Sequence, residues 1–204
     1  MKKSFTDVLR LTFKWFLDPV AGFLNRLGFT PISVTLIGVV GNMVAAYFIA
    51  RGDISIGGLI VLIVWPVDAL DGTMARLRGE AGDWGAFVDS VSDRYSELII
   101  LGAVLYYFAM TNQHILAVVT FVAAAGSILV SYVKARAEAQ SFSAREGLLT
   151  RAERYLVLGP TLLFNIPAIG VWIIAILANF TALQRIWVVR AQAHDKMRKV
   201  RKGD

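Results

Sequence analysis

The 204-residue sequence contains no cysteine, and only 18% of its residues are charged. The lack of cysteine excludes disulfide bonds, thiolate catalysis and zinc–thiolate sites, and it leaves the redox compartment undetermined. With 56% hydrophobic residues and a mean hydropathy of +0.60, the chain is too apolar for an ordinary soluble domain. Several apolar segments approach the roughly 20 residues that cross a hydrocarbon core of about 30 Å. We therefore predict an all-α integral membrane protein.

Acidic residues and histidines are also few. The 21 Lys and Arg residues against 15 Asp and Glu give a formal net charge of +6. In a membrane protein this excess indicates membrane lipids with anionic headgroups and an anionic substrate as partners, and no nucleic acid is expected. His114 falls in a turn and His194 in a basic tail, so neither is expected to be a ligand or a base.

Residues 1–29 are predicted to form an amphipathic juxtamembrane segment, not a signal peptide, because charged and apolar residues interleave. Apolar side chains recur there at helical spacing, at Phe5, Val8, Leu9, Phe13, Phe16 and Leu17. A soluble helix docked on the protein is the alternative. Asp18-Pro19 is expected to end this helix, and a second short amphipathic turn leads to Gly28.

Six transmembrane helices are predicted within residues 30–192. They cover about 31–51, 54–75, 84–110, 115–137, 152–166 and 168–190. Six spans place both termini on one side, and of the 21 Lys and Arg residues only Arg51 lies on the other. The positive-inside rule then makes both termini cytoplasmic. Residues 193–204 form a basic cytoplasmic tail, and we expect a multi-pass protein of the cell (inner) membrane.

Four aspartates lie at the cytoplasmic ends of the second and third spans: Asp68 and Asp71, then Asp89 and Asp93. Their spacings of i, i+3 and i, i+4 place each pair on one helix face. A carboxylate at bilayer depth is costly, and four brought together would repel one another. One or two divalent cations would resolve this repulsion, and hard oxygen ligands favour Mg²⁺ or Mn²⁺.

The neighbouring residues favour a bulky phosphate ligand held through these cations. Gly72, Ala75 and Gly85 leave room beside the carboxylates, and Arg76 offers a forked donor for phosphate. Pro66 removes a backbone hydrogen bond and is expected to kink the helix just before the aspartates. Simple ion pairing of the aspartates with nearby arginines is the alternative, but it would not require the small residues.

The complete pattern, Asp68-x2-Asp71-Gly72-x2-Ala75-Arg76-x8-Gly85-x3-Asp89-x3-Asp93, resembles the signature of the class I CDP-alcohol phosphotransferases without a gap or substitution. Members of this family transfer a phosphatidyl-type group from a CDP-linked lipid to an alcohol and release CMP. The resemblance implies a six-helix membrane domain with an N-terminal interfacial helix, CDP-diacylglycerol as donor, and a homodimer. The small residues of 123–126 would allow close helix packing in such a dimer.

The resemblance also implies roles for single residues. Asp68, Asp71, Asp89 and Asp93 would hold two Mg²⁺ ions, which Mn²⁺ can replace, and Asp93 would also be the general base in a direct displacement. The residues at CDP-lipid-binding positions are Pro31, Ile32, Ser33, Val34, Asp68, Gly72, Ala75, Arg76, Gly82 and Gly85. At Gly82, relatives often carry a hydroxyl residue. Residues 31–34 also fit a plain helix start capped by Thr30, and both interpretations can hold.

Basic residues of the later spans indicate an acceptor with its own phosphate. Lys134, Arg154 and a span-six arginine, Arg185 or Arg190 with Arg190 preferred, are predicted to bind this phosphate. The runs at 132–138 and 151–154 resemble those of phosphatidylinositol phosphate synthases, which implies inositol 1-phosphate as the acceptor. The other arginines of this region, Arg136, Arg145 and Arg151, are expected to be interfacial anchors.

Several alternatives remain open. Glycerol 3-phosphate, the acceptor of phosphatidylglycerophosphate synthases in the same family, also needs a phosphate pocket, whereas serine brings no phosphate. A divalent-cation transporter is disfavoured because the carboxylates lie near one membrane face and no second half repeats the pattern. A non-enzymatic lipid-binding scaffold is the third class of function.

Overall fold

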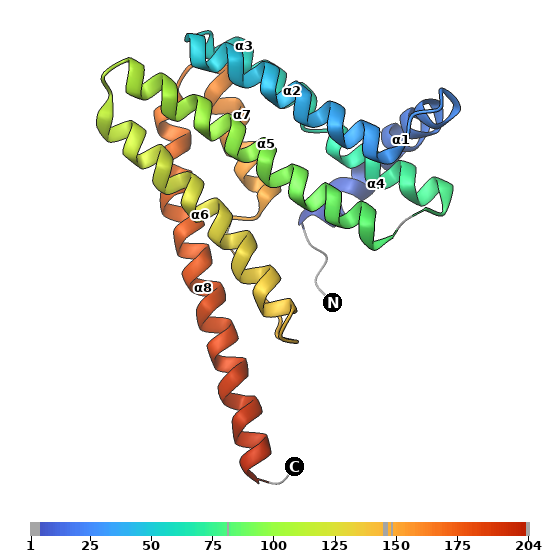
Figure 1. Cartoon of the computed structure of the whole chain (residues 1–204), viewed down its shortest axis with the longest axis vertical. Helices are drawn as coiled ribbons and strands as arrows, with labels where there is room; N and C mark the ends of the chain where they lie inside the picture. The colour runs from blue at the N-terminus through green and yellow to red at the C-terminus, as the bar shows by residue number, and fades with distance from the viewer. Residues whose placement is uncertain (1–4, 81, 145–146, 148, 203–204) are drawn as a thin grey trace.

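The computed structural model describes residues 5–80, 82–144, 147 and 149–202, with the side chains of 5–14, 16, 68 and 199–202 left out. The described residues form eight α-helices and no β-strand (Figure 1). These are α1 (Phe5–Arg26), α2 (Pro31–Arg51), α3 (Ile54–Val64), α4 (Val67–Arg78), α5 (Asp83–Met110), α6 (His114–Glu138), α7 (Arg151–Leu163) and α8 (Pro167–Lys202). The all-α prediction is confirmed.

Four helical stretches within the described residues are long and apolar enough to cross a membrane. They are Pro31–Arg51, Ile54–Arg78, His114–Glu138 and Pro167–Arg198. The other two predicted spans, about 84–110 and 152–166, are not among these four stretches, each for its own reason. The first 15 residues of α5 include five charged residues, and α7 has 13 residues, a length of about 20 Å at 1.5 Å per residue.

Local signals place most helix ends where the sequence predicts them. Thr30 caps α2 through a capping box with Ser33, and Gly52 ends that helix with φ +95°. The predicted second span breaks at Trp65-Pro66 into α3 and α4, because proline supplies no backbone N–H. The expected kink before the aspartates is thus confirmed.

The predicted end of the first helix at Asp18-Pro19 is wrong, because α1 continues through Pro19 to Arg26. Leu17 and Ala21, on either side of the proline, are buried in one apolar cluster with residues of α2 and α4. Burial on both sides offsets the hydrogen bond that Pro19 cannot make. The apolar side chains predicted at residues 5–16 lie outside the described part.

The last helix is longer than predicted, since α8 extends through the basic tail to Lys202. Residues 191–202 contain no glycine or proline, so nothing in the sequence stops the helix. Figure 1 shows this extension projecting beyond the other helices. Within it, Gln192 fastens the α6–α7 connection: its Oε1 accepts from the Ser143 N–H at 2.9 Å and its Nε2 donates to the Ser143 carbonyl at 2.6 Å.

The buried apolar residues form two separate clusters. The larger joins α2, α3 and α5–α8, and the smaller consists of Leu17 and Ala21 of α1, Val34 of α2, and Leu70 and Met74 of α4. Among the side chains that the structure describes, only those of α2 contribute buried residues to both clusters. The first turn of α2 therefore packs with α1 and α4, while its second half packs in the main bundle.

Two of the small residues at 123–126 on α6 pack against other helices of the same chain. Ala123 is fully buried, and a Cβ on Gly126 would lie 2.9 Å from Cγ of Asn179 on α8. The Asn179 amide donates to the Val122 carbonyl at 3.1 Å across this contact. Close α6–α8 packing thus depends on Gly126.

Gly58 offers a test of the α3–α7 contact. A Cβ on this residue would lie 2.6 Å from the carbonyl carbon of Leu162, which is backbone and cannot rotate away. We expect Gly58→Ala to destabilise the folded protein by about 1–3 kcal/mol, measured as a lower melting temperature in detergent. Gly102→Ala is the control, since nothing lies within 4 Å of its Cβ position. Equal melting temperatures for the two variants would contradict this account.

Candidate active site

Asp71, on α4, is a buried carboxylate whose orientation is fixed by two donors. Its Oδ2 lies 2.5 Å from the Thr35 hydroxyl of α2, and its Oδ1 lies 2.5 Å from the N–H of Gly72. Hydrogen bonds to a carboxylate are stronger than neutral ones. Thr35 therefore fixes the direction in which Asp71 presents its remaining lone pairs.

Sequence reasoning missed Thr35, although a signal was present. Thr35, Gly38 and Asn42 are small or polar, recur at helical spacing in an otherwise apolar helix, and are all buried. A polar stripe on a membrane helix indicates the face that meets other protein groups rather than lipid. This stripe is the face of α2 that Asp71 contacts.

Asp93, the predicted general base on α5, is buried and forms an ion pair with Arg151, the first residue of α7. The Arg151 guanidinium also lies 5.4 Å from the ring centroid of Tyr155, a cation–π distance. The expectation that Arg151 is an interfacial anchor is wrong. The start of α7 lies beside α5, so the side chain reaches a buried carboxylate instead of the membrane surface.

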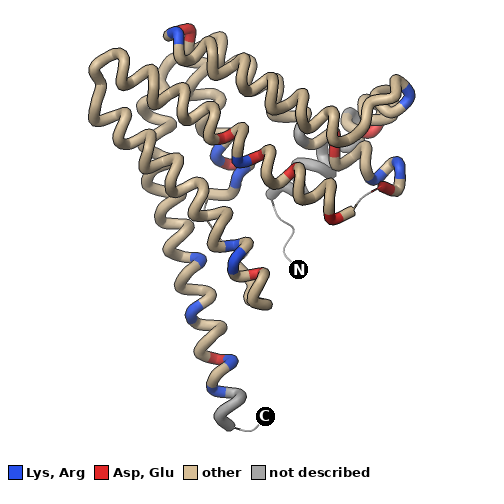
Figure 2. Tube along the Cα trace, in the orientation of Figure 1, with Lys and Arg blue, Asp and Glu red and all other residues tan. Residues whose placement is uncertain are grey.

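A second ion pair links the same two helices one turn further along. Arg154 donates from Nε to Glu97 Oε1 at 2.5 Å and from Nη2 to Glu97 Oε2 at 2.8 Å. Arg154 is 2% exposed and Glu97 is 4% exposed. Sequence reasoning missed Glu97, which follows Asp93 at i+4 and so shares its helix face. Figure 2 shows acidic residues along the first half of α5, with basic residues beside them.

The four aspartates are not all placed as a cluster. Asp89 is half-buried one turn before Asp93 on α5, and the side chain of Asp68 lies outside the described part. Among the side chains that are described, no three from His, Asp and Glu lie close enough to hold a metal ion. The convergence of all four carboxylates stays a prediction.

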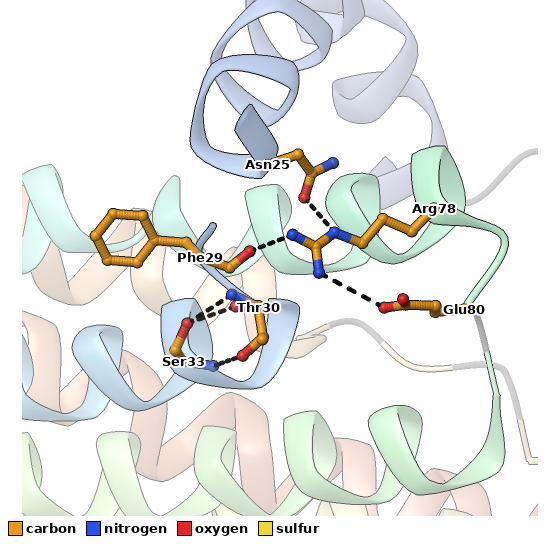
Figure 3. A network of polar contacts seen from close by, with 6 residues as sticks. All are labelled: Asn25, Phe29, Thr30, Ser33, Arg78 and Glu80. Carbon is orange, nitrogen blue, oxygen red and sulfur yellow. Dashed lines mark hydrogen bonds and ion pairs between the residues drawn. The ribbon is translucent and has the colours of Figure 1, made fainter. Parts of the chain in front are cut away.

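The residues at the predicted CDP-lipid positions fall into two groups. The first turn of α2 holds Pro31–Val34, where the Ser33 N–H donates to Thr30 Oγ1 at 3.1 Å and the Thr30 N–H donates to Ser33 Oγ at 3.0 Å (Figure 3). The helix-start interpretation is therefore confirmed, which leaves the ligand role open. The second group lies on α4 and at the start of α5.

In the second group, space is available beside exposed donors. Arg76 is exposed and donates from Nη2 to Thr73 Oγ1 at 2.9 Å, and Ala75 is half-buried next to it. A Cβ on Gly72 would meet Nη1 of Arg76 at 3.4 Å, so the guanidinium covers this glycine. Gly82 and Gly85 are exposed, and nothing lies within 4 Å of a Cβ on Gly85.

The predicted acceptor residues differ in position. Lys134 is half-buried, 3.9 Å from Glu138, and Arg190 is exposed. Arg185 is buried instead: its Nη1 donates to the Val130 carbonyl at 2.6 Å, and it lies near enough to Arg154 for the two charges to interact. Of the two span-six arginines, Arg185 is the one that faces the interior with Arg154. Arg145 lies outside the described residues, and Arg136 is exposed, as expected of an anchor.

Comparison with known proteins identifies the class. The CDP-alcohol phosphatidyltransferase family model matches residues 29–191, so the chain belongs to this family of membrane-associated lipid-synthesising transferases. A phosphatidylinositol phosphate synthase of Streptomyces avermitilis is 34% identical, with 94% of this chain and 85% of that protein covered.

Solved structures of the phosphatidylinositol phosphate synthase of Mycobacterium tuberculosis are similar to this fold. The structure with CDP-diacylglycerol bound has a TM-score of 0.80 at 29% identity, covering 85% of this chain and 92% of that one. The structure in complex with manganese and citrate has a TM-score of 0.81 at 29% identity, covering 85% and 88%.

We expect Thr35 to affect metal binding through Asp71, the predicted metal ligand that it contacts. Thr35→Val keeps the side-chain shape but removes the donor to Asp71 Oδ2. We expect the Mn²⁺ concentration for half-maximal activity to rise about 10- to 100-fold, the range for loss of a group that orients a metal ligand. Thr35→Ser, which keeps the hydroxyl, should stay near wild type. An unchanged metal requirement in Thr35→Val would contradict the orienting role.

Variants of the Glu97–Arg154 pair can test its effects on stability and on activity separately. Arg154→Met leaves a buried carboxylate unpaired and should cost about 3–5 kcal/mol of stability, seen as a large drop in melting temperature. The double variant Glu97→Leu with Arg154→Met removes both charges and should melt near wild type, yet lack transfer activity. Lys134→Met breaks the pair with Glu138, in which both side chains are about half exposed, and should barely change the melting temperature. A double variant as unstable as the single one would contradict the pairing argument.

Proposed function

We propose that this protein transfers the phosphatidyl group of CDP-diacylglycerol to inositol 1-phosphate, forming phosphatidylinositol phosphate and CMP. The observation that supports this most is the buried Arg154, which pairs with Glu97 one helical turn beyond Asp93, the last residue of the aspartate signature, and has the buried Arg185 near it. Such an arrangement suits an acceptor with a hydroxyl at one end and a phosphate at the other. The similar protein from Streptomyces avermitilis is named a phosphatidylinositol phosphate synthase.

The metal site of the proposal consists of Asp68, Asp71, Asp89 and Asp93, holding two Mg²⁺ ions that Mn²⁺ can replace. Carboxylates are the hard oxygen ligands these cations prefer, and the Thr35–Asp71 contact is the kind of orienting hydrogen bond that metal ligands receive. When bound, the ions would neutralise the pyrophosphate and the charge that develops on departing CMP.

The chain's own groups would then do the rest of the chemistry. Asp93 would accept the proton of the attacking hydroxyl, with Arg151 holding the carboxylate in place until the acceptor arrives. The oxygen of the acceptor would displace CMP from phosphorus directly, without a covalent enzyme intermediate. On the donor side, Pro31–Val34, Gly72, Ala75, Arg76, Gly82 and Gly85 would contact the cytidine diphosphate group.

For the acceptor phosphate we propose Lys134, Arg154 and a span-six arginine. Burial favours Arg185 over Arg190 for the third position. Glu97 occupies the Nε–Nη2 edge of Arg154, and Nη1 donates to the Leu149 carbonyl at 3.3 Å, so one N–H of each terminal nitrogen is left for an anion. Glycerol 3-phosphate remains the second candidate acceptor, since it presents the same phosphate group.

We also propose the six-span topology, with residues 1–29 in the interface, both termini and the active site facing the cytoplasm of the cell (inner) membrane, and the chain as a homodimer. The ion pairs support α5 as a span despite its charges. Asp93 and Glu97 are each neutralised by an arginine of α7, which lowers the cost of charge inside a bundle. The distribution of Lys and Arg residues supports the orientation.

The deciding experiment supplies purified protein with CDP-diacylglycerol, Mg²⁺ and, separately, inositol 1-phosphate, glycerol 3-phosphate or serine. We expect CMP and a phospholipid product only with inositol 1-phosphate. Asp93→Asn should lower kcat by about 100- to 10,000-fold, the usual contribution of a general base. Asp83→Asn, at the first position of α5 and outside the signature, is the matched control.

The other outcomes each exclude something. Product only with glycerol 3-phosphate would overturn the acceptor assignment and keep the reaction class. No metal-dependent CMP release with any acceptor would overturn the transferase, and Mg²⁺ or Mn²⁺ flux into protein-containing liposomes would then favour transport. A scaffold would show neither turnover nor flux.

A further inference from the structure

Arg78, in the last turn of α4, joins segments that are far apart in the sequence (Figure 3). Its Nε donates to Asn25 Oδ1 of α1 at 2.7 Å, and its Nη2 donates to the carbonyl oxygen of Phe29 at 2.6 Å. Its Nη1 lies 3.8 Å from the exposed Glu80 carboxylate. The Arg78 side chain is 23% exposed, and its contact with Asn25 is partly shielded from water.

The α1–α2 connection is shaped to present these acceptors. Gly28 has φ +85°, a left-handed conformation that glycine adopts without strain. The Gly28 N–H donates to the Asn25 carbonyl at 3.2 Å, and the Phe29 N–H donates to the Leu24 carbonyl at 3.2 Å, which ends α1. The Phe29 carbonyl is then left for Arg78, one residue before the Thr30 cap of α2.

The same three helices share an apolar cluster. Leu17 and Ala21 of α1, Val34 of α2, and Leu70 and Met74 of α4 pack together, and none belongs to the main cluster of the bundle. Apolar packing is non-directional, so it limits the separation of the three helices more than their register. Arg78 adds directional contacts at the edge of this cluster.

We propose that Arg78 is a positioning residue for the donor site. It holds the start of α2 against the end of α4, and so it sets the separation between the two groups of CDP-lipid-binding residues, Pro31–Val34 and Gly72–Arg76. Arg78 acts through Asn25 and Phe29. Lysine could not replace it, because a single ammonium lacks the rigid fork that reaches two divergent acceptors. The inference rests on the proposed function, because it assigns a donor role to these residues.

Steady-state kinetics test this role. Arg78→Lys and Arg78→Gln should raise the KM for CDP-diacylglycerol about 10-fold, with kcat and the KM for the acceptor within about 2-fold of wild type. Glu80→Gln removes only the long, exposed contact and should match wild type. An unchanged donor KM in the Arg78 variants, or equal rises in both KM values, would overturn the proposal.

Because the sequence contains no cysteine, spin labels can be attached to introduced cysteines alone, which gives a measurement independent of turnover. Spin labels on Leu27→Cys and Leu77→Cys, both exposed positions, report the separation of the α1 end from the α4 end. We expect one narrow distance distribution, unchanged by Glu80→Gln and clearly broadened by Arg78→Gln. A distance distribution in Arg78→Gln as narrow as that of the wild type would show that Arg78 does not hold the two helix ends together. Because the labels report structure alone, a wild-type protein without CMP release would refute the proposed function and not this contact.

Discussion

The constraint on which the rest of this structure depends is the burial of charge in an apolar helix bundle. Asp93 and Glu97 stand one turn apart on α5, and Arg151 and Arg154 stand three residues apart on α7, so the two acids meet the two bases in register. Neither helix could bury these charges at low cost without the other, because an unpaired buried charge is strongly destabilising. The two pairs therefore fix how the short α7 lies against α5.

A second feature is that the residues expected to bind the donor and those expected to bind the acceptor belong to different helices. The groups expected to hold the nucleotide lie on α4, at the start of α5 and on the first turn of α2, where the small cluster packs. The buried arginines expected near the acceptor belong to α7 and α8 in the main bundle. Helix α5 connects the two regions, because its start belongs to the first and its Asp93 pairs with Arg151 of α7. This suits a reaction in which two bound molecules must meet at one carboxylate.

The sequence was sufficient wherever the information is local. The Thr30 cap, the Gly52 turn and the break at Pro66 depend on a few neighbouring residues, and all three are confirmed. Predictions failed where a distant partner decides. Pro19 is kept inside α1 by contacts with α2 and α4, and Arg151 turns inward because α5 offers a carboxylate. Glu97 was missed for the same reason. The polar stripe of α2 marked the face that holds Thr35, but its partner Asp71 is known only once α2 and α4 are placed side by side.

The extension of α8 has one more consequence, for the entropy of substrate binding. At 1.5 Å per residue this helix of 36 residues measures about 54 Å, well beyond a hydrocarbon core of about 30 Å. Its projecting end holds Ser143 through two hydrogen bonds to Gln192, and Thr181 accepts from the Leu149 N–H at 3.2 Å. The α8 helix therefore holds Ser143 and Leu149, two described residues of the α6–α7 connection, in place. Arg154, whose Nη1 donates to the Leu149 carbonyl at 3.3 Å, would then meet an anion with little further ordering cost.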